Sequence, residues 1–151
     1  MLLENLFAGI TIAVVTSIIT VWLAFKRFRS ERWWDRKADA YSAIIESLHH
    51  MKRYCEKNID VLESHRDMSD EERTDLYTKF KEGVKKIEKA KDIGCFIISN
   101  EAVKQLDLLL QGLYSAEGAR DFYEYLERQL SVINNCLNSI CEIAKSDLKV
   151  K

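Results

Sequence analysis

The hydrophobic pattern of the chain begins with a long uncharged run. No charged residue occurs from Asn5 to Phe25, and most of these positions are apolar or small. A helix of about 20 such residues is about 30 Å long, which matches the hydrocarbon core of a bilayer. Glu4 before the run and Lys26 after it do not fit a cleavable signal peptide, which needs a basic start and a small-residue cleavage site. The pattern therefore predicts a single, uncleaved transmembrane helix.

The flank that follows this run is basic. Its cations are Lys26, Arg27, Arg29, Arg32, Arg36 and Lys37. Because cationic flanks stay on the cytoplasmic side of a membrane, we expect the N-terminus outside and the rest of the chain in the cytoplasm. The chain then divides into an anchor with a basic juxtamembrane segment, residues 1–32, and a cytosolic domain, residues 33–151.

Two tryptophans mark the predicted exit from the membrane. Trp33 and Trp34 lie about 12 Å beyond Phe25 if the helix continues, which is the depth of the lipid headgroups. Stacking on a nucleobase is the alternative role of a tryptophan next to an arginine. The residues that we expect at the membrane interface are Trp33, Trp34, Lys26, Arg27 and Arg29.

Within the apolar run, small residues recur every four positions. Gly9, Ala13 and Ser17 share one face of the helix, and Thr16 and Thr20 lie beside them. Small residues let helix backbones approach closely in lipid, so we expect this strip to form a homo-oligomer interface. The alternative is that such residues are simply common in membrane helices.

Apolar positions continue beyond the anchor at alternating steps of four and three. The predicted seam consists of Trp34, Ala38, Tyr41, Ile45, Leu48, Lys52, Cys55, Ile59 and Leu62. Only Lys52 interrupts it, so the anchor helix is predicted to run on as one long helix. Asp67, Met68 and Ser69 should end it.

Three further helices are predicted. Ser69 and Glu72 form a capping box that opens one helix, which continues to about Asp92, before Gly94. Ser99 or Asn100 caps the next, a loop follows from Gly112 to Gly118, and the last begins at about Ala119. Their apolar stripes, the absence of proline and the presence of only 5 glycines indicate an all-α fold, an antiparallel helical bundle behind one transmembrane helix.

Composition excludes some functions. The 151 residues leave room for one domain after the anchor, and 23 Lys and Arg against 24 Asp and Glu give almost no net charge. The chain is therefore not a generally basic nucleic-acid coat, and we expect no duplex nucleic acid as a partner.

Few residues indicate catalytic or metal chemistry. Cys55, Cys95, Cys136 and Cys141 lie on or beside apolar stripes without C-x-x-C spacing, so we interpret them as reduced core thiols. A zinc site that pairs Cys55 with His49 or His50 is the alternative, and it would need ligands from elsewhere. No catalytic or phosphate-loop motif occurs, so we expect no enzyme activity, cofactor or metal.

One polar pattern stands out. Lys81, Lys85 and Lys89 follow one another at four-residue steps along one helix face, and this stripe itself contains no acidic residue, although Lys86 beside it can pair with Glu82. A solvated helix face is the simplest interpretation. In an oligomer, copies of this stripe would converge and bind a polyanion, with Lys52, Arg53 and His49 as a second wall of the ligand pocket.

The layout resembles a known class of proteins. The anchor, the exit segment Arg32-Trp33-Trp34-Asp35-Arg36-Lys37-Ala38-Asp39-Ala40-Tyr41 and a bundle without catalytic motifs are similar to the small membrane-anchored ancillary effectors of type III CRISPR systems. That resemblance implies an antiviral defence protein of the bacterial inner membrane, whose oligomeric cytosolic part binds a cyclic oligoadenylate and signals to the membrane. It transfers no binding residue. A membrane-tethered scaffold that docks a partner protein is the alternative, and a pore that needs no ligand is disfavoured because most of the chain forms a folded domain.

Overall fold

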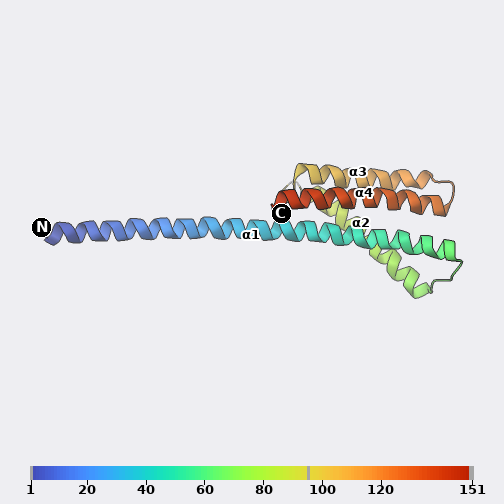
Figure 1. The fold of residues 1–151 in the computed structure, drawn as a ribbon, viewed down its shortest axis with the longest axis horizontal. Coiled ribbons are helices and arrows are strands. Elements are labelled where there is room, and N and C mark those ends of the chain that lie inside the picture. The colour runs from blue at the N-terminus through green and yellow to red at the C-terminus, as the bar shows by residue number, and fades with distance from the viewer. Residues whose placement is uncertain (1, 95, 150–151) are drawn as a thin grey trace. The chain divides into compact units, whose positions relative to one another are not determined.

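Apart from the short connections between its helices and the last described residue, the described part of the chain is helical. The computed structural model describes the backbone of residues 2–94 and 96–149, and their side chains except those of 2–14 and 30. Within these ranges there are four α-helices, α1 (Leu2–Ser64), α2 (Asp70–Gly94), α3 (Asn100–Ser115) and α4 (Phe122–Leu148), a short 3-10 helix, η1 (Ala116–Gly118), and no strand (Figure 1). The predicted all-α fold is confirmed.

The chain forms two compact units, Met1–Arg36 and Lys37–Lys151. The first consists of the N-terminal part of α1 alone. Among the described residues, no helix is long and apolar enough to cross a membrane. The predicted span from Asn5 to Phe25 lies partly outside the described side chains, at positions 5–14, and these include Gly9 and Ala13 of the predicted oligomer strip.

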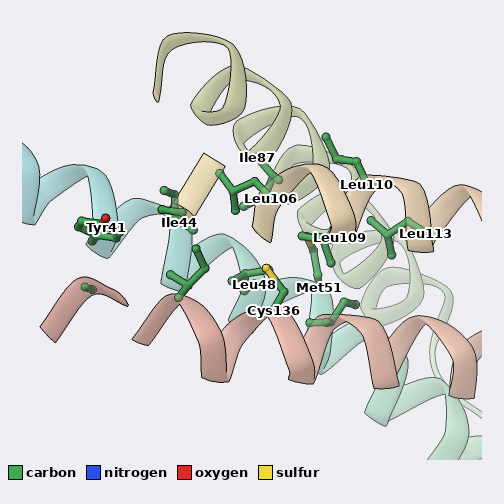
Figure 2. Close-up of a cluster of buried hydrophobic side chains, with 14 of the residues drawn as sticks. Tyr41, Ile44, Leu48, Met51, Ile87, Leu106, Leu109, Leu110, Leu113 and Cys136 are labelled. Carbon is green, nitrogen blue, oxygen red and sulfur yellow. The ribbon is translucent and has the colours of Figure 1, made fainter. Parts of the chain in front are cut away.

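The second unit is a helical bundle with one hydrophobic core. Antiparallel α3 and α4 lie side by side (Figure 1), and α1 runs antiparallel to α4, since Tyr41 bonds Asp147 and Glu63 bonds Tyr123. All four helices contribute fully buried side chains, among them Leu48, Ile87, Leu106 and Ile133, and Figure 2 shows most of this cluster. Each such side chain contributes about 1.5–3 kcal/mol of hydrophobic free energy. The predicted helical bundle is confirmed.

The seam that α1 buries is wider than predicted. Tyr41, Leu48 and Cys55 are buried as expected, but Ile44 and Met51 are buried with them, at 2% and 0% exposure, whereas Ile45 and Lys52 are only half-buried. A single seam at steps of four and three fits one partner helix. In the bundle α1 packs against α2 as well as α4, so two neighbouring rows of side chains are covered. Lys52 therefore lies beside the core and does not interrupt it.

Helix ends follow the capping chemistry closely. The backbone N–H of Glu72 donates to Ser69 Oγ at 3.2 Å, as predicted, and Ser99 caps α3 by accepting from Ala102 N at 3.3 Å. The last helix begins later than predicted, at Phe122, because the Asp121 carboxylate accepts from the backbone N–H of Glu124 at 2.8 Å.

The loop predicted to start at Gly112 is also wrong, since α3 continues to Ser115. Gly112 stays helical and lets α4 approach. A Cβ atom built there would lie only 2.6 Å from Val132 Cγ1, so the glycine serves close packing of two helices and does not end one.

Candidate functional site

The three lysines of the predicted stripe lie on the open side of α2. Lys81, Lys85 and Lys89 are all exposed. Gly83, in the same helix, packs against Met51 and Ser47 of α1. At 100° per residue, Lys81 and Lys85 each point about 160° away from Gly83, so they face solvent.

Direct contacts leave most of this charge uncompensated. Lys81 Nζ lies 5.4 Å above the ring centroid of Tyr77, and in the described part of the chain neither Lys85 nor Lys89 has an acidic oxygen within salt-bridge distance. Lys79, on another side of the helix, is paired with Asp75 at 2.7 Å. The stripe thus presents ammonium groups that are free to meet an anion, and Lys79 does not.

The second predicted wall of the pocket is elsewhere. Lys52 Nζ lies 3.4 Å from Glu56 Oε1, so a carboxylate already compensates its charge. Arg53 and His49 are exposed on α1, and the His49 ring lies 5.9 Å from that of His50. Because the lysine stripe points away from α1, one chain does not bring the two sets into a common pocket.

A cleft that the sequence did not reveal lies at the end of the bundle where α1 meets the start of α2 and α4. It has a volume of about 450 Å³ and is lined by Tyr54, Asn58, Val61, Leu62, Met68, Arg73, Thr74, Tyr77 and Phe122. Leu62, Tyr77 and Phe122 are between 42% and 50% exposed. Their positions come from three helices, so no spacing within one segment could have identified them.

Of the four cysteines predicted to be core thiols, Cys55 and Cys136 are buried, Cys141 is only half-buried, and Cys95 lies outside the described residues. Burial raises the pKa of both Cys55 and Cys136 to about 12, because a thiolate is poorly solvated there. The Cys55 thiol donates to Gln129 Oε1 at 3.8 Å, which satisfies a buried amide of α4. No group of three His, Cys, Asp or Glu in the described residues is placed to hold a metal ion.

A polar cluster fixes the other end of the bundle. Asp147 of α4 accepts hydrogen bonds from the Tyr41 hydroxyl and from Lys37 Nζ, the latter at 3.2 Å. Burial favours the neutral carboxyl, but these two bonds outweigh it and lower the pKa of Asp147. The Tyr41 hydroxyl also accepts from the Ser99 backbone N–H at 3.4 Å and so ties α1 to the start of α3.

Unit Met1–Arg36 exposes apolar surface along its described length. Its large apolar side chains are about half exposed or more, namely Val15, Ile18, Ile19, Val21, Trp22, Leu23, Phe25, Phe28 and Trp33, and Trp34 is similar. In the predicted small-residue strip, Ser17 is exposed and Thr20 Oγ1 donates to Thr16 O at 2.8 Å.

The predicted interface cations of this unit differ from one another. Arg27 is paired with Glu31 at 2.8 Å, whereas Lys26 Nζ lies 5.3 Å above the Trp22 ring and Arg29 has no ion pair among the described residues. Only some of these cations are therefore available to a phosphate.

No protein-family model, curated protein or solved structure matches the chain.

Proposed function

We propose that this chain is a membrane-anchored, non-enzymatic effector, in which an N-terminal helix spans the bilayer and an oligomeric cytosolic bundle binds an anionic nucleotide second messenger. One observation carries the proposal. The bundle buries its own core, while the helix of unit Met1–Arg36 leaves ten large apolar side chains from Val15 to Trp34 exposed. An exposed apolar surface of this size needs lipid or protein to cover it.

The lysine stripe supports the choice of ligand. Lys81, Lys85 and Lys89 offer three ammonium groups along one helix face, and neither Lys85 nor Lys89 is compensated by a carboxylate among the described residues. Several phosphates in series, as in a cyclic oligoadenylate, match such an array when two or more chains bring their stripes together.

The helix α1 supports a route from ligand to membrane. It contributes Tyr41, Leu48 and Met51 to the bundle core and also contains the whole of the proposed anchor. A ligand that changes how bundles pack on one another therefore acts on the same helix that enters the bilayer. In this proposal the protein is a homo-oligomer of the bacterial inner membrane, with its C-terminal bundle in the cytoplasm.

Ligand binding is tested with the full chain in lipid nanodiscs and fluorescently labelled cyclic oligoadenylates of several ring sizes. Lys85→Glu should weaken binding at least about tenfold, because it reverses an unpaired charge within the stripe. Lys79→Glu is the control, since it makes the same change in net charge on the same helix at a lysine already paired with Asp75. Equal effects of the two variants, or no binding by the wild type, would overturn the ligand.

The anchor is tested separately. The wild-type chain should stay in the membrane pellet after alkaline carbonate extraction of cells that express it. Replacing Ile18 and Ile19 together by aspartate should release it, since a charge at the centre of a bilayer costs about 2.5–3.5 kcal/mol. Release of the wild type would refute the anchor regardless of any ligand.

A second function, docking of a partner protein, is favoured by the cleft at the α1–α2 end of the bundle. Its exposed Leu62, Tyr77 and Phe122 offer an apolar hollow of about 450 Å³, enough to take a large side chain. A photo-crosslinking residue at Leu62 should then trap one discrete partner, and the same residue at exposed Lys104 on α3 should not. Equal labelling from both positions would count against docking.

A further inference from the structure

One side of α1 near the proposed membrane exit alternates aromatic rings with cations. Trp22, Lys26, Arg29, Trp33 and Arg36 follow at steps of four, three, four and three, which places them within about 80° of one another around the helix. With Phe25, Phe28 and Arg32 they line a shallow groove of about 980 Å³ on this single helix. We refer to Trp22, Lys26, Arg29, Trp33 and Arg36 as the Trp22–Arg36 stripe.

The acidic residues of this segment do not neutralise the stripe. Arg27 donates to Glu31 at 2.8 Å, and both lie on the opposite side of the helix, about 140–180° from Trp22. The other acidic residue, Asp35, lies about 140° from Trp22 and has no ion pair among the described residues. Within the stripe, Lys26 Nζ lies 5.3 Å above the Trp22 ring, while Arg29 and Arg36 have no ion pair among the described residues. Three cations and two indole rings are thus presented together without a carboxylate.

The combination of indole rings and cations in the stripe favours an anionic lipid over a free polyanion as the ligand. Indole rings favour the boundary between hydrocarbon and headgroups, and arginine next to them reaches phosphate oxygens. A free polyanion would not need Trp22, which belongs to the uncharged run that ends at Phe25. The charge complementarity and the continuity with the apolar run both fit a lipid that has an anionic headgroup.

The stripe does not compete with the proposed oligomer interface. Ser17, Thr20 and Thr16, the described members of the small-residue face, lie about 140°, 160° and 120° around the helix from Trp22. Helices that associate through that face would leave the Trp22–Arg36 stripe turned outward, toward lipid.

We propose that the Trp22–Arg36 stripe is a binding site for anionic phospholipids, with Arg29 and Arg36 contacting headgroup phosphates, Trp33 lying among the headgroups and Trp22, about 16 Å deeper along the helix, packing beside the acyl chains. This inference rests on the proposed membrane anchor and adds the lipid class to it. The anchored helix then concentrates anionic lipid around itself.

The chain carries its own reporters for the test. All 3 tryptophans, Trp22, Trp33 and Trp34, lie in or next to the stripe. The full chain is reconstituted into vesicles that contain phosphatidylglycerol and phosphatidylcholine in equal amounts, and the acyl chains of one or the other lipid are brominated to quench tryptophan fluorescence. The composition stays constant, so the difference in quenching reports which lipid is enriched at the helix.

Brominated phosphatidylglycerol should quench more strongly than brominated phosphatidylcholine in the wild type. Arg29→Gln combined with Arg36→Gln should lower this preference at least about tenfold, since each cation near an anionic surface contributes substantially to attraction. Lys57→Gln combined with Lys104→Gln is the matched control, because it removes the same charge at two exposed lysines of the bundle. The control should keep the wild-type preference.

Two results would overturn the inference, and they differ in what else they refute. Equal quenching by the two lipids, or a preference that survives in the Arg29 and Arg36 double variant, would refute the anionic-lipid site and leave the anchor intact. Quenching by neither lipid would show that the helix does not insert, and would refute the anchor as well.

Discussion

The close approach of α3 and α4 at Gly112 gives a prediction whose sign depends on a neighbouring side chain. In Gly112→Ala, the new methyl group would lie 2.6 Å from Cγ1 and 2.9 Å from Cγ2 of Val132. The substitution gains about 1 kcal/mol of helix propensity. The overlap costs about 1–3 kcal/mol, because the two helices must separate or Val132 must leave its rotamer. We therefore expect Gly112→Ala to destabilise the bundle by about 1 kcal/mol.

Shortening Val132 should reverse the effect. Val132→Ala removes both overlapping methyl groups and leaves only its Cβ at 3.3 Å from the new methyl, a contact that small adjustments can accommodate. In this background Gly112→Ala should stabilise the bundle by about 0.5–1 kcal/mol, since the helix-propensity gain then dominates. The coupling between the two positions would be about 2 kcal/mol, well above the error of additivity for distant sites.

The measurement is a double-mutant cycle on the full chain in mild detergent, with urea unfolding of the bundle followed by far-UV circular dichroism. The wild type, both single variants and the double variant give the four free energies of unfolding. If Gly112→Ala changes stability by the same amount with valine and with alanine at position 132, the two helices do not meet there as described, and the reasoning is refuted.

Three further predictions concern ionisation and caps. Burial raises the pKa of Cys55 to about 12, so iodoacetamide should label Cys141 well before Cys55 in the native protein, and equal labelling rates would contradict this. The stabilisation from keeping Cys55 neutral should be full below pH 9 and should fade as the pH rises toward 12. Tyr41→Phe should lower the free energy of unfolding by about 1–2 kcal/mol and raise the pKa of Asp147, because the carboxylate loses a hydrogen-bond donor. The stability that this carboxylate contributes above about pH 4 should then be lost at a higher pH on acidification, which unfolding across the acid range measures. Asp121→Ala should cost about 1 kcal/mol in the same unfolding assay, whereas Asp121→Asn should cost much less, since either side chain can cap α4.

Local sequence signals predicted the helices well. The four-and-three spacing of apolar residues located all four α-helices, and Ser69 and Ser99 fixed two of the starts, because a hydroxyl that accepts from a backbone N–H three residues later is a local interaction. The start of α4 could be predicted from the same capping chemistry. Asp121 followed three residues later by Glu124 is a capping pattern, and it places the start of α4 after the predicted Ala119.

The candidate sites were predicted less completely. Exposure of Lys81, Lys85 and Lys89 followed from periodicity, but their separation from His49 and Arg53 depends on which side of α2 packs against α1. The ion pair of Lys52 with Glu56, four residues later in the same helix, is a local interaction that the sequence encodes directly. The cleft around Tyr77 and Phe122 could not be found locally at all, since it needs the ends of three helices to meet.

The sequence by itself determined the elements: an uncharged run with a basic flank, amphipathic helices, their caps and a stripe of lysines. These depend on contacts within about four residues, which spacing encodes directly. Only the tertiary structure decided which faces were covered. It made Gly112 a packing position and not a helix end, widened the buried seam of α1 to include Ile44 and Met51, and turned the lysines away from α1. Each of these outcomes depends on how neighbouring helices interlock, a property of side chains distant in sequence that no local period specifies.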